Sequence, residues 1–95
     1  MAETGKKFEG GQIVMTAGVN NLIAKNIEFS NQVVGSLRRH FSGDWGDLGD
    51  EDKKANNDAL VAGERVLSAY NGVKKIWIIT EADRSATTVL FPTEY

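Results

Sequence analysis

The sequence contains no cysteine and only one histidine, His40. Without a thiol the chain can form no disulfide, hold no thiolate zinc site and carry out no thiol catalysis. A single histidine also excludes a histidine-rich metal centre. We therefore predict that the protein uses neither a metal nor a cofactor.

Long apolar runs are also missing. The first residues, MAETGKKFEGGQ, contain no stretch typical of a signal peptide, and no later segment approaches the length of a membrane span. The formal net charge is only −2, which gives no long-range attraction to nucleic acid or to an anionic membrane. We expect a cytoplasmic protein without membrane contact, and the charge does not indicate a nucleic-acid partner.

What is present is typical of one small globular domain. The chain has 95 residues, of which 41% are hydrophobic and 25% charged. One proline and the lack of any low-complexity tract predict a single domain over residues 1–95. Only about the first eight residues are expected to be flexible.

The first half of the chain has one strand signal followed by helix signals. Residues 11–17 are short and β-rich, which predicts a strand. Thr16 is then placed to cap a short helical turn over residues 18–25. Apolar residues recur at helical spacing between Ser30, the expected N-cap, and Phe41.

A third helix is predicted between two end signals. Asp50 is the expected N-cap, and Gly63 supplies a residue that tolerates the left-handed conformation at a helix end. Gly43 has the same role after the second helix. The loop between these helices has the sequence GDWGDL.

The last third changes to a period of two. Strands are expected at residues 65–70, 73–80 and 86–91, with a tight turn at Asn71-Gly72 and a second turn at residues 82–85. This pattern predicts an α+β fold: two to three helices packed on an antiparallel sheet of about four strands, with a C-terminal three-strand meander. The final segment, residues 86–91, is apolar and is expected at a sheet edge, where it could pair with a second copy to form a homodimer.

Two segments carry a family resemblance. HFSGDWGDLGDEDKKANNDAL, followed by GERVLSAYNGVKKIWIITEADRSATTVLFPTEY, resembles small uncharacterised bacterial proteins encoded on plasmids and integrative elements, usually called "plasmid-related protein". The resemblance extends from about Gly11 to Tyr95. It implies a bacterial mobile-element origin and a cytoplasmic product, and it brings no activity.

The GDWGDL loop is the first candidate binding site. Trp45 would anchor a partner, because tryptophan is frequent at interface hot spots, while Asp44 and Asp47 would grip the partner's cations or amides. The alternative is structural: Trp45 covers the core and the aspartates make local turns. A calcium loop is excluded by spacing, because a loop starting at Asp44 has Gly46 and Leu48 at its third and fifth positions.

Asp83 and Arg84, in the turn at residues 82–85, extend this candidate site. If the turn and the GDWGDL loop share one end of the sheet, Arg84 would pair with Asp44 or Asp47. The alternative is an ordinary turn with a solvated Arg84. The resulting interpretation is a non-enzymatic accessory or regulatory module that binds a macromolecule, namely a host or element protein.

The second interpretation is a small metal-independent ribonuclease or toxin-like protein. Such an enzyme needs a general base or acid and cations near the phosphate. His40, Arg65 and Arg84 are the candidates for these roles, and Thr88 or Tyr70 would orient the phosphate. This interpretation requires His40 and at least one arginine to share a pocket.

Overall fold

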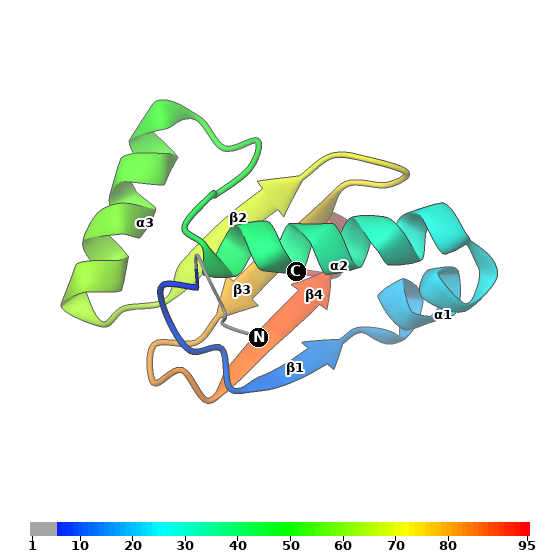
Figure 1. The fold of residues 1–95 in the computed structure, drawn as a ribbon, viewed down its shortest axis with the longest axis horizontal. Helices are drawn as coiled ribbons and strands as arrows, with labels where there is room; N and C mark the ends of the chain where they lie inside the picture. The colour runs from blue at the N-terminus through cyan, green and yellow to red at the C-terminus, as the bar shows by residue number, and fades with distance from the viewer. Residues whose placement is uncertain (1–5) are drawn as a thin grey trace.

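The computed structural model describes residues 6–95, with three α-helices and one four-stranded sheet. Helix α2 lies across the sheet, and α3 lies beyond one sheet edge (Figure 1). Among residues 6–95, no helix is long and apolar enough to cross a membrane. The elements in chain order are β1 (Gln12–Met15), α1 (Ala17–Lys25), α2 (Ile27–Phe41), α3 (Asp50–Ala62), β2 (Val66–Tyr70), β3 (Ile76–Thr80), β4 (Ala86–Leu90) and the 3-10 turn η1 (Pro92–Glu94).

The strand order in the sheet is β1-β4-β3-β2. Strands β2, β3 and β4 form an antiparallel meander, which confirms the predicted α+β fold with its C-terminal three-strand unit. β1 pairs with β4 in parallel, so the sheet is mixed rather than wholly antiparallel. Parallel neighbours require a long crossover, and here the chain passes through all three helices and two strands before β4.

This topology corrects the expected position of residues 86–91. β4 lies between β1 and β3, so its backbone is paired on both sides and cannot join a second copy. The edges of the sheet are β1 and β2.

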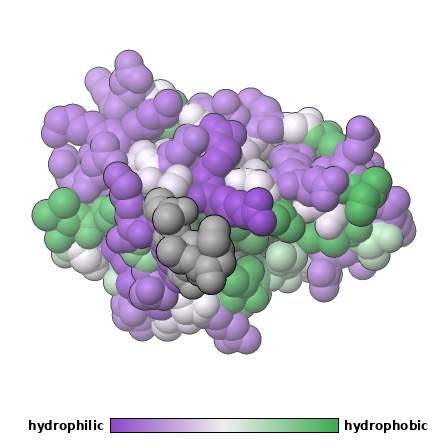
Figure 2. Space-filling model, in the orientation of Figure 1, coloured by the Kyte–Doolittle hydropathy of each residue, from purple (hydrophilic) through white to green (hydrophobic). Residues whose placement is uncertain are grey.

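The main core lies between the sheet and helices α1 and α2. Strand residues alternate between the two faces, and Ile76, Ile78 and Val89 are fully buried against Phe29 and Val33. A second, smaller core lies under α3, where Trp45, Ala59 and Val66 pack together. The face that carries α2 is mostly polar, with apolar patches at its left and right ends and in its lower half (Figure 2).

Side-chain caps fix the starts of the first two helices. Thr16 caps α1 as predicted, accepting a hydrogen bond from the Val19 amide at 3.3 Å. The prediction that Ser30 caps the second helix is wrong: Asn26 does so, accepting from the Phe29 amide at 2.9 Å. Asn26 also ends α1, so the apolar period begins one turn earlier than Ser30 suggests.

At α3 the predicted N-cap is displaced by one residue. Gly49 occupies the cap without a side-chain hydrogen bond, and Asp50 is the first helical residue, where its negative charge suits the helix dipole. The ends are as predicted, because Gly43 and Gly63 both have positive φ, at 82° and 74°.

The loop between β2 and β3 is longer than the tight turn expected from Asn-Gly. Tyr70 pairs with Ile76, so residues 71–75 form the connection. Gln32 of α2 holds this loop: its Oε1 accepts from the Val73 amide, and its Nε2 donates to the Lys74 carbonyl, both at 2.8 Å. A side chain outside the hairpin therefore sets the loop length.

The expected flexible segment lies partly outside the described residues, which begin at Lys6. Residues 7 and 8 contact the rest of the fold. Lys7 donates its amide to the Phe41 carbonyl at 2.7 Å, and the Phe8 ring packs against the rings of His40 and Trp45.

Candidate functional site

The GDWGDL loop runs along the free side of β2 and pairs with it. The Ala69 amide donates to the Trp45 carbonyl at 3.3 Å, and the Asp47 amide donates to the Ala69 carbonyl at 2.7 Å. These two bonds form a parallel bridge between Gly46 and Ala69. The loop therefore acts as a short additional strand on an edge that would otherwise be open.

Gly46 is required for this close approach. Its φ of 76° lies in the left-handed region, and a Cβ at this position would lie 2.0 Å from the Ala69 carbonyl oxygen. Only glycine satisfies both conditions.

Two further side chains complete the closure of the β2 edge. Asn56 of α3 pairs with Leu67 like a strand neighbour: its Nδ2 donates to the Leu67 carbonyl at 2.5 Å and its Oδ1 accepts from the Leu67 amide at 3.2 Å. Asp47 accepts from the Asn71 amide at 2.7 Å. Thus Leu67, Ala69 and Asn71, the alternate residues whose backbones face outward, all have partners.

Trp45 is 2% exposed, which corrects its proposed role as an anchor for a partner. Its indole Nε1 donates to Asn57 Oδ1 at 2.8 Å, and its ring packs edge-on against His40. Gly43 and Gly46, which lie on either side of Trp45, both have positive φ, and this backbone turn directs the ring inward. The structural alternative is the correct one for this residue.

Asp44 stabilises the same loop. Its carboxylate accepts from Arg39 Nε at 2.8 Å and from the Gly46 amide at 3.1 Å, the second bond being the predicted local turn. The hydrogen bond from Arg39 is the main reason that the pKa of Asp44 is lowered. Asp44 is exposed, but both of its carboxylate oxygens are already paired within the chain.

Asp83 and Arg84 do not join the GDWGDL loop. Arg84 Nη1 donates to the Glu64 carbonyl at 2.8 Å and to the Glu81 carbonyl at 3.1 Å, and Asp83 accepts from the Ser85 amide at 3.0 Å. The turn lies at the end of the sheet where β2 begins, whereas Asp47 lies where β2 ends. The predicted pair between Arg84 and Asp44 or Asp47 is therefore absent, and the shared polar site is wrong.

His40 is the centre of a buried polar network. Its side chain is fully buried, with Nδ1 2.6 Å from Ser68 Oγ and Nε2 2.8 Å from Thr80 Oγ1. Thr80 Oγ1 lies 2.7 Å from Thr87 Oγ1, which donates to the Gly10 carbonyl at 2.8 Å. The network crosses the sheet from β2 to the residues before β1.

When His40 is neutral, only one assignment of donors and acceptors satisfies this chain of hydrogen bonds. Thr87 uses its only proton on the Gly10 carbonyl, so Thr80 donates to Thr87 and must accept from His40 Nε2. Nδ1 of His40 then accepts from Ser68. Burial, and secondarily the positive charge of Arg84, lower the pKa of His40 to about 3, so the imidazole is neutral near pH 7.

These positions contradict the ribonuclease interpretation. His40 has no exposed surface, and both of its ring nitrogens are engaged with Ser68 and Thr80. Thr88 follows Thr87 in β4 and therefore points to the opposite face of the sheet. The proposed groups do not surround one pocket.

The other two ribonuclease candidates have partners elsewhere. Tyr70 is fully buried and donates to the Asp44 carbonyl at 2.7 Å, and its burial raises its pKa. Arg65 Nη2 donates to the Tyr95 hydroxyl at 2.6 Å.

A hollow of about 400 Å³ lies between α3 and the outer face of β2 and β3. Two small residues line it: Ala55 on α3 and Ala69 on β2, which is paired with Trp77 of β3. Trp77 keeps part of its surface exposed, and its ring contacts Tyr95 edge-on at 5.4 Å. The lining therefore combines small residues with one aromatic ring.

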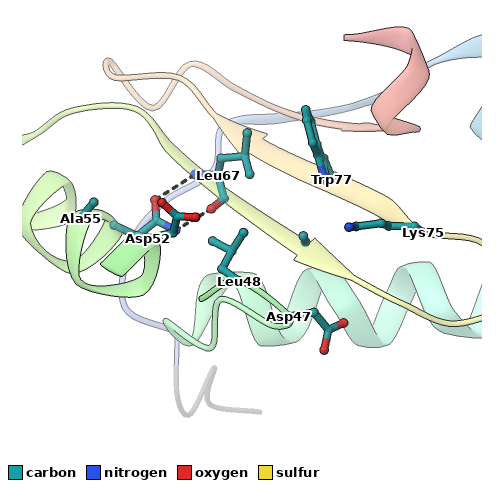
Figure 3. A pocket seen from close by; sticks show the side chains of 9 residues that line it. Asp47, Leu48, Asp52, Ala55, Leu67, Lys75 and Trp77 are labelled. Carbon is teal, nitrogen blue, oxygen red and sulfur yellow. Dashed lines mark hydrogen bonds between the residues drawn. The ribbon is translucent and has the colours of Figure 1, made fainter. Parts of the chain in front are cut away.

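The hollow has apolar walls, and charged residues lie on its two sides. Figure 3 shows Leu48 and Leu67 between α3 on one side and β3 on the other. Asp52 belongs to the α3 side, whereas the amino group of Lys75 points into the hollow from the β3 side (Figure 3). Asp47 is also among the lining residues. Apolar walls with a few polar groups are typical of binding sites.

Trp45, which the sequence suggested as an anchor, is buried, whereas Trp77, which the sequence analysis did not select, is partly exposed. The residues next to Trp77 in the sequence are apolar, so no local signal indicates that its ring reaches the surface. Among residues 6–95, no group of three His, Cys, Asp or Glu side chains is arranged to hold a metal ion.

Comparisons of the chain with protein-family models, with curated proteins and with solved structures found no match.

Proposed function

We propose that this protein is a non-enzymatic accessory module of a bacterial mobile element, working in the cytoplasm by binding a host or element protein. The observation that supports binding is the hollow beside Trp77, which combines a partly exposed aromatic ring, apolar walls and charged residues of both signs. The mobile-element assignment comes from the sequence resemblance.

The hollow defines the chemistry of the partner. Its volume of about 400 Å³ is large enough to accept an apolar side chain from a protein surface. Asp47 and Asp52 favour a basic residue of the partner near α3, and Lys75 favours an acidic residue near β3. The proposed anchor thus belongs to the partner, and the charges of this protein select the orientation.

Asp47 keeps the binding role assigned to it from the sequence, although one of its oxygens also accepts from Asn71. Trp77 replaces Trp45 as the aromatic contact. Tryptophan at a partly exposed position in a concave surface is a common source of binding energy.

The proposal is tested by site-specific photo-crosslinking in a bacterial lysate. A photoreactive amino acid at Lys75 should give a crosslinked protein that the same group at Lys54, on the exposed side of α3, does not. The captured protein is then purified, and its affinity for wild-type protein and variants is measured by calorimetry.

Trp77→Ala and Lys75→Glu should each weaken this binding at least about tenfold, as expected for hot-spot and charge-reversal changes. Val61→Ala, at a residue that is 91% exposed on α3, should leave the affinity unchanged. Equal affinity of all the variants, or equal capture from both crosslinker positions, would show that the hollow is not the binding site.

A further inference from the structure

The second edge of the sheet, β1, is unlike the closed β2 edge. The amides of Gln12 and Thr16 donate to β4 residues or their neighbours, at 3.0 Å to the Ser85 carbonyl and 3.2 Å to the Val89 carbonyl. In a parallel strand the backbone direction alternates, so the N–H and C=O groups of Ile13 and Met15 point away from the sheet. Figure 1 shows no helix or strand of residues 6–95 outside β1.

The side chains of β1 add to this exposed backbone. Ile13 is 42% exposed and Val14 is 39% exposed, on opposite faces of the strand. Residues 10–24 carry no charged side chain. Natural edge strands are usually protected by charges, proline, bulges, a covering element or a very short length. β1 is short, at four residues, but residues 12–15 carry no charge and no proline.

We propose that β1 of one molecule pairs antiparallel with β1 of a second copy, giving a two-fold symmetric dimer with one continuous sheet. This inference is independent of the hollow beside Trp77, which lies at the other edge of the sheet. It also differs from pairing through β4, which the topology excludes.

The positions of the outward backbone groups select one register. With the two-fold axis at Val14, Ile13 of each copy lies opposite Met15 of the other, and each such pair exchanges two backbone hydrogen bonds. An axis at Ile13 would bring only one outward-facing pair of strand residues together. The register centred on Val14 therefore forms four hydrogen bonds and satisfies every outward group of the strand.

A second copy is the occupant that fits this edge best. It presents the same two outward-facing residues at the same spacing, and the uncharged segment 10–24 brings no like charges together at the axis. The two Val14 residues form a non-hydrogen-bonded pair, in which the facing side chains lie close together. Pairing also covers Ile13 with the facing strand.

Sedimentation velocity of the full chain over a range of concentrations tests the proposal. The wild-type protein should show a concentration-dependent monomer–dimer equilibrium. Val14→Lys should weaken the dimer at least about tenfold, because two ammonium groups would meet at the axis. Val61→Lys, the same change at an exposed valine of α3, should sediment like wild type.

Single cysteines test the register in a chain that otherwise has none. Val14→Cys should oxidise to a disulfide-linked dimer, because directly opposite Cβ atoms lie about 4.5–5.5 Å apart and small shifts bring them within disulfide reach. Ile13→Cys should not, because the two cysteines would be diagonal neighbours about 7–8 Å apart. Circular dichroism should show both variants folded.

Two results would overturn the proposal: wild-type protein that remains monomeric at its highest soluble concentration, or a dimer that Val14→Lys and Val61→Lys leave equally stable. Amide exchange gives an answer without substitutions. The Ile13 and Met15 amides should gain protection as concentration rises, while the Gln12 amide stays protected throughout, and exchange independent of concentration would reject the dimer.

Discussion

The two edges of the sheet are treated in opposite ways. Along β2, the GDWGDL loop, Asn56 and the Asp47 side chain pair the outward-facing amides and carbonyls of Leu67 and Ala69 and the amide of Asn71. Along β1, the corresponding groups of Ile13 and Met15 face away from the sheet. The difference teaches that a loop sequence can close one edge of a sheet against strand pairing while the other edge keeps outward-facing backbone groups.

The largest expected loss of stability comes from adding a side chain at Gly46, where the loop approaches β2. Gly46→Ala should lower the free energy of unfolding by about 3 kcal/mol or more, because the new Cβ would both strain the backbone and collide with the Ala69 carbonyl. Urea unfolding measures this change.

The matched control is Gly35→Ala in α2, where a Cβ would meet nothing within 4 Å. This change should stabilise the protein by about 0.5–1 kcal/mol through the higher helix propensity of alanine. Similar effects at both glycines would show that the loop does not depend on its close approach to β2.

Asn56 provides the next test of the closed edge. Asn56→Ala should reduce the free energy of unfolding by about 2 kcal/mol, because it leaves the amide and carbonyl of Leu67 without their protein partners. Asn31→Ala, at an exposed helical asparagine of α2, should change stability by less than about 0.5 kcal/mol. Unfolding in urea compares the two, and equal values would remove Asn56 from the edge.

The His40 network connects the two edges and should make their stability dependent on pH. Its folded-state pKa of about 3 lies below the unfolded value of 6.5, so the unfolded chain binds the extra proton as pH falls. The free energy of unfolding should therefore decrease by about 2 kcal/mol between pH 8 and pH 5, with the loss beginning near 6.5.

Urea unfolding at several pH values measures this loss, and the NMR shift of the His40 imidazole reports the protonation directly. The imidazole resonances should not titrate between pH 8 and pH 5. A midpoint near 6.5 in the folded protein would show that the ring is accessible and the network is open.

The smallest expected effect concerns the end of the closed edge. Asp47→Ala should cost about 1 kcal/mol, because the Asn71 amide loses its acceptor, whereas Asp47→Asn retains an acceptor oxygen and should cost less. Hydrogen exchange of the Asn71 amide should accelerate in Asp47→Ala but not in Asp47→Asn. Unchanged exchange would assign its protection to another group.

Local signals in the sequence were sufficient for much of the fold. The alternating pattern after Arg65 predicted the meander, and Thr16, Gly43 and Gly63 were placed correctly at helix ends, because these features depend on neighbours within one turn. The parallel pairing of β1 was missed, since the partner strand lies at the far end of the chain and no local pattern records it.

The candidate site was harder to predict because it depends on contacts across the fold. Trp45 appeared exposed from its polar neighbours, but the loop turns its ring inward against His40. Trp77 was not selected from the sequence, because its partner Ala69 and the helix that lines the same hollow lie elsewhere in the chain. Both assignments depend on which residue faces which across the sheet.

The pairing of β1 with β4 also has a consequence for how the protein is made. Gln12 is synthesised 74 residues before its partner Ala86. Contacts between such distant parts of a chain form slowly, and unpaired strands are prone to aggregate while they wait. The pairs of the meander do not involve β1, so the meander can form first. β1, the edge strand with outward-facing backbone groups, is therefore the strand that stays unpaired longest during synthesis.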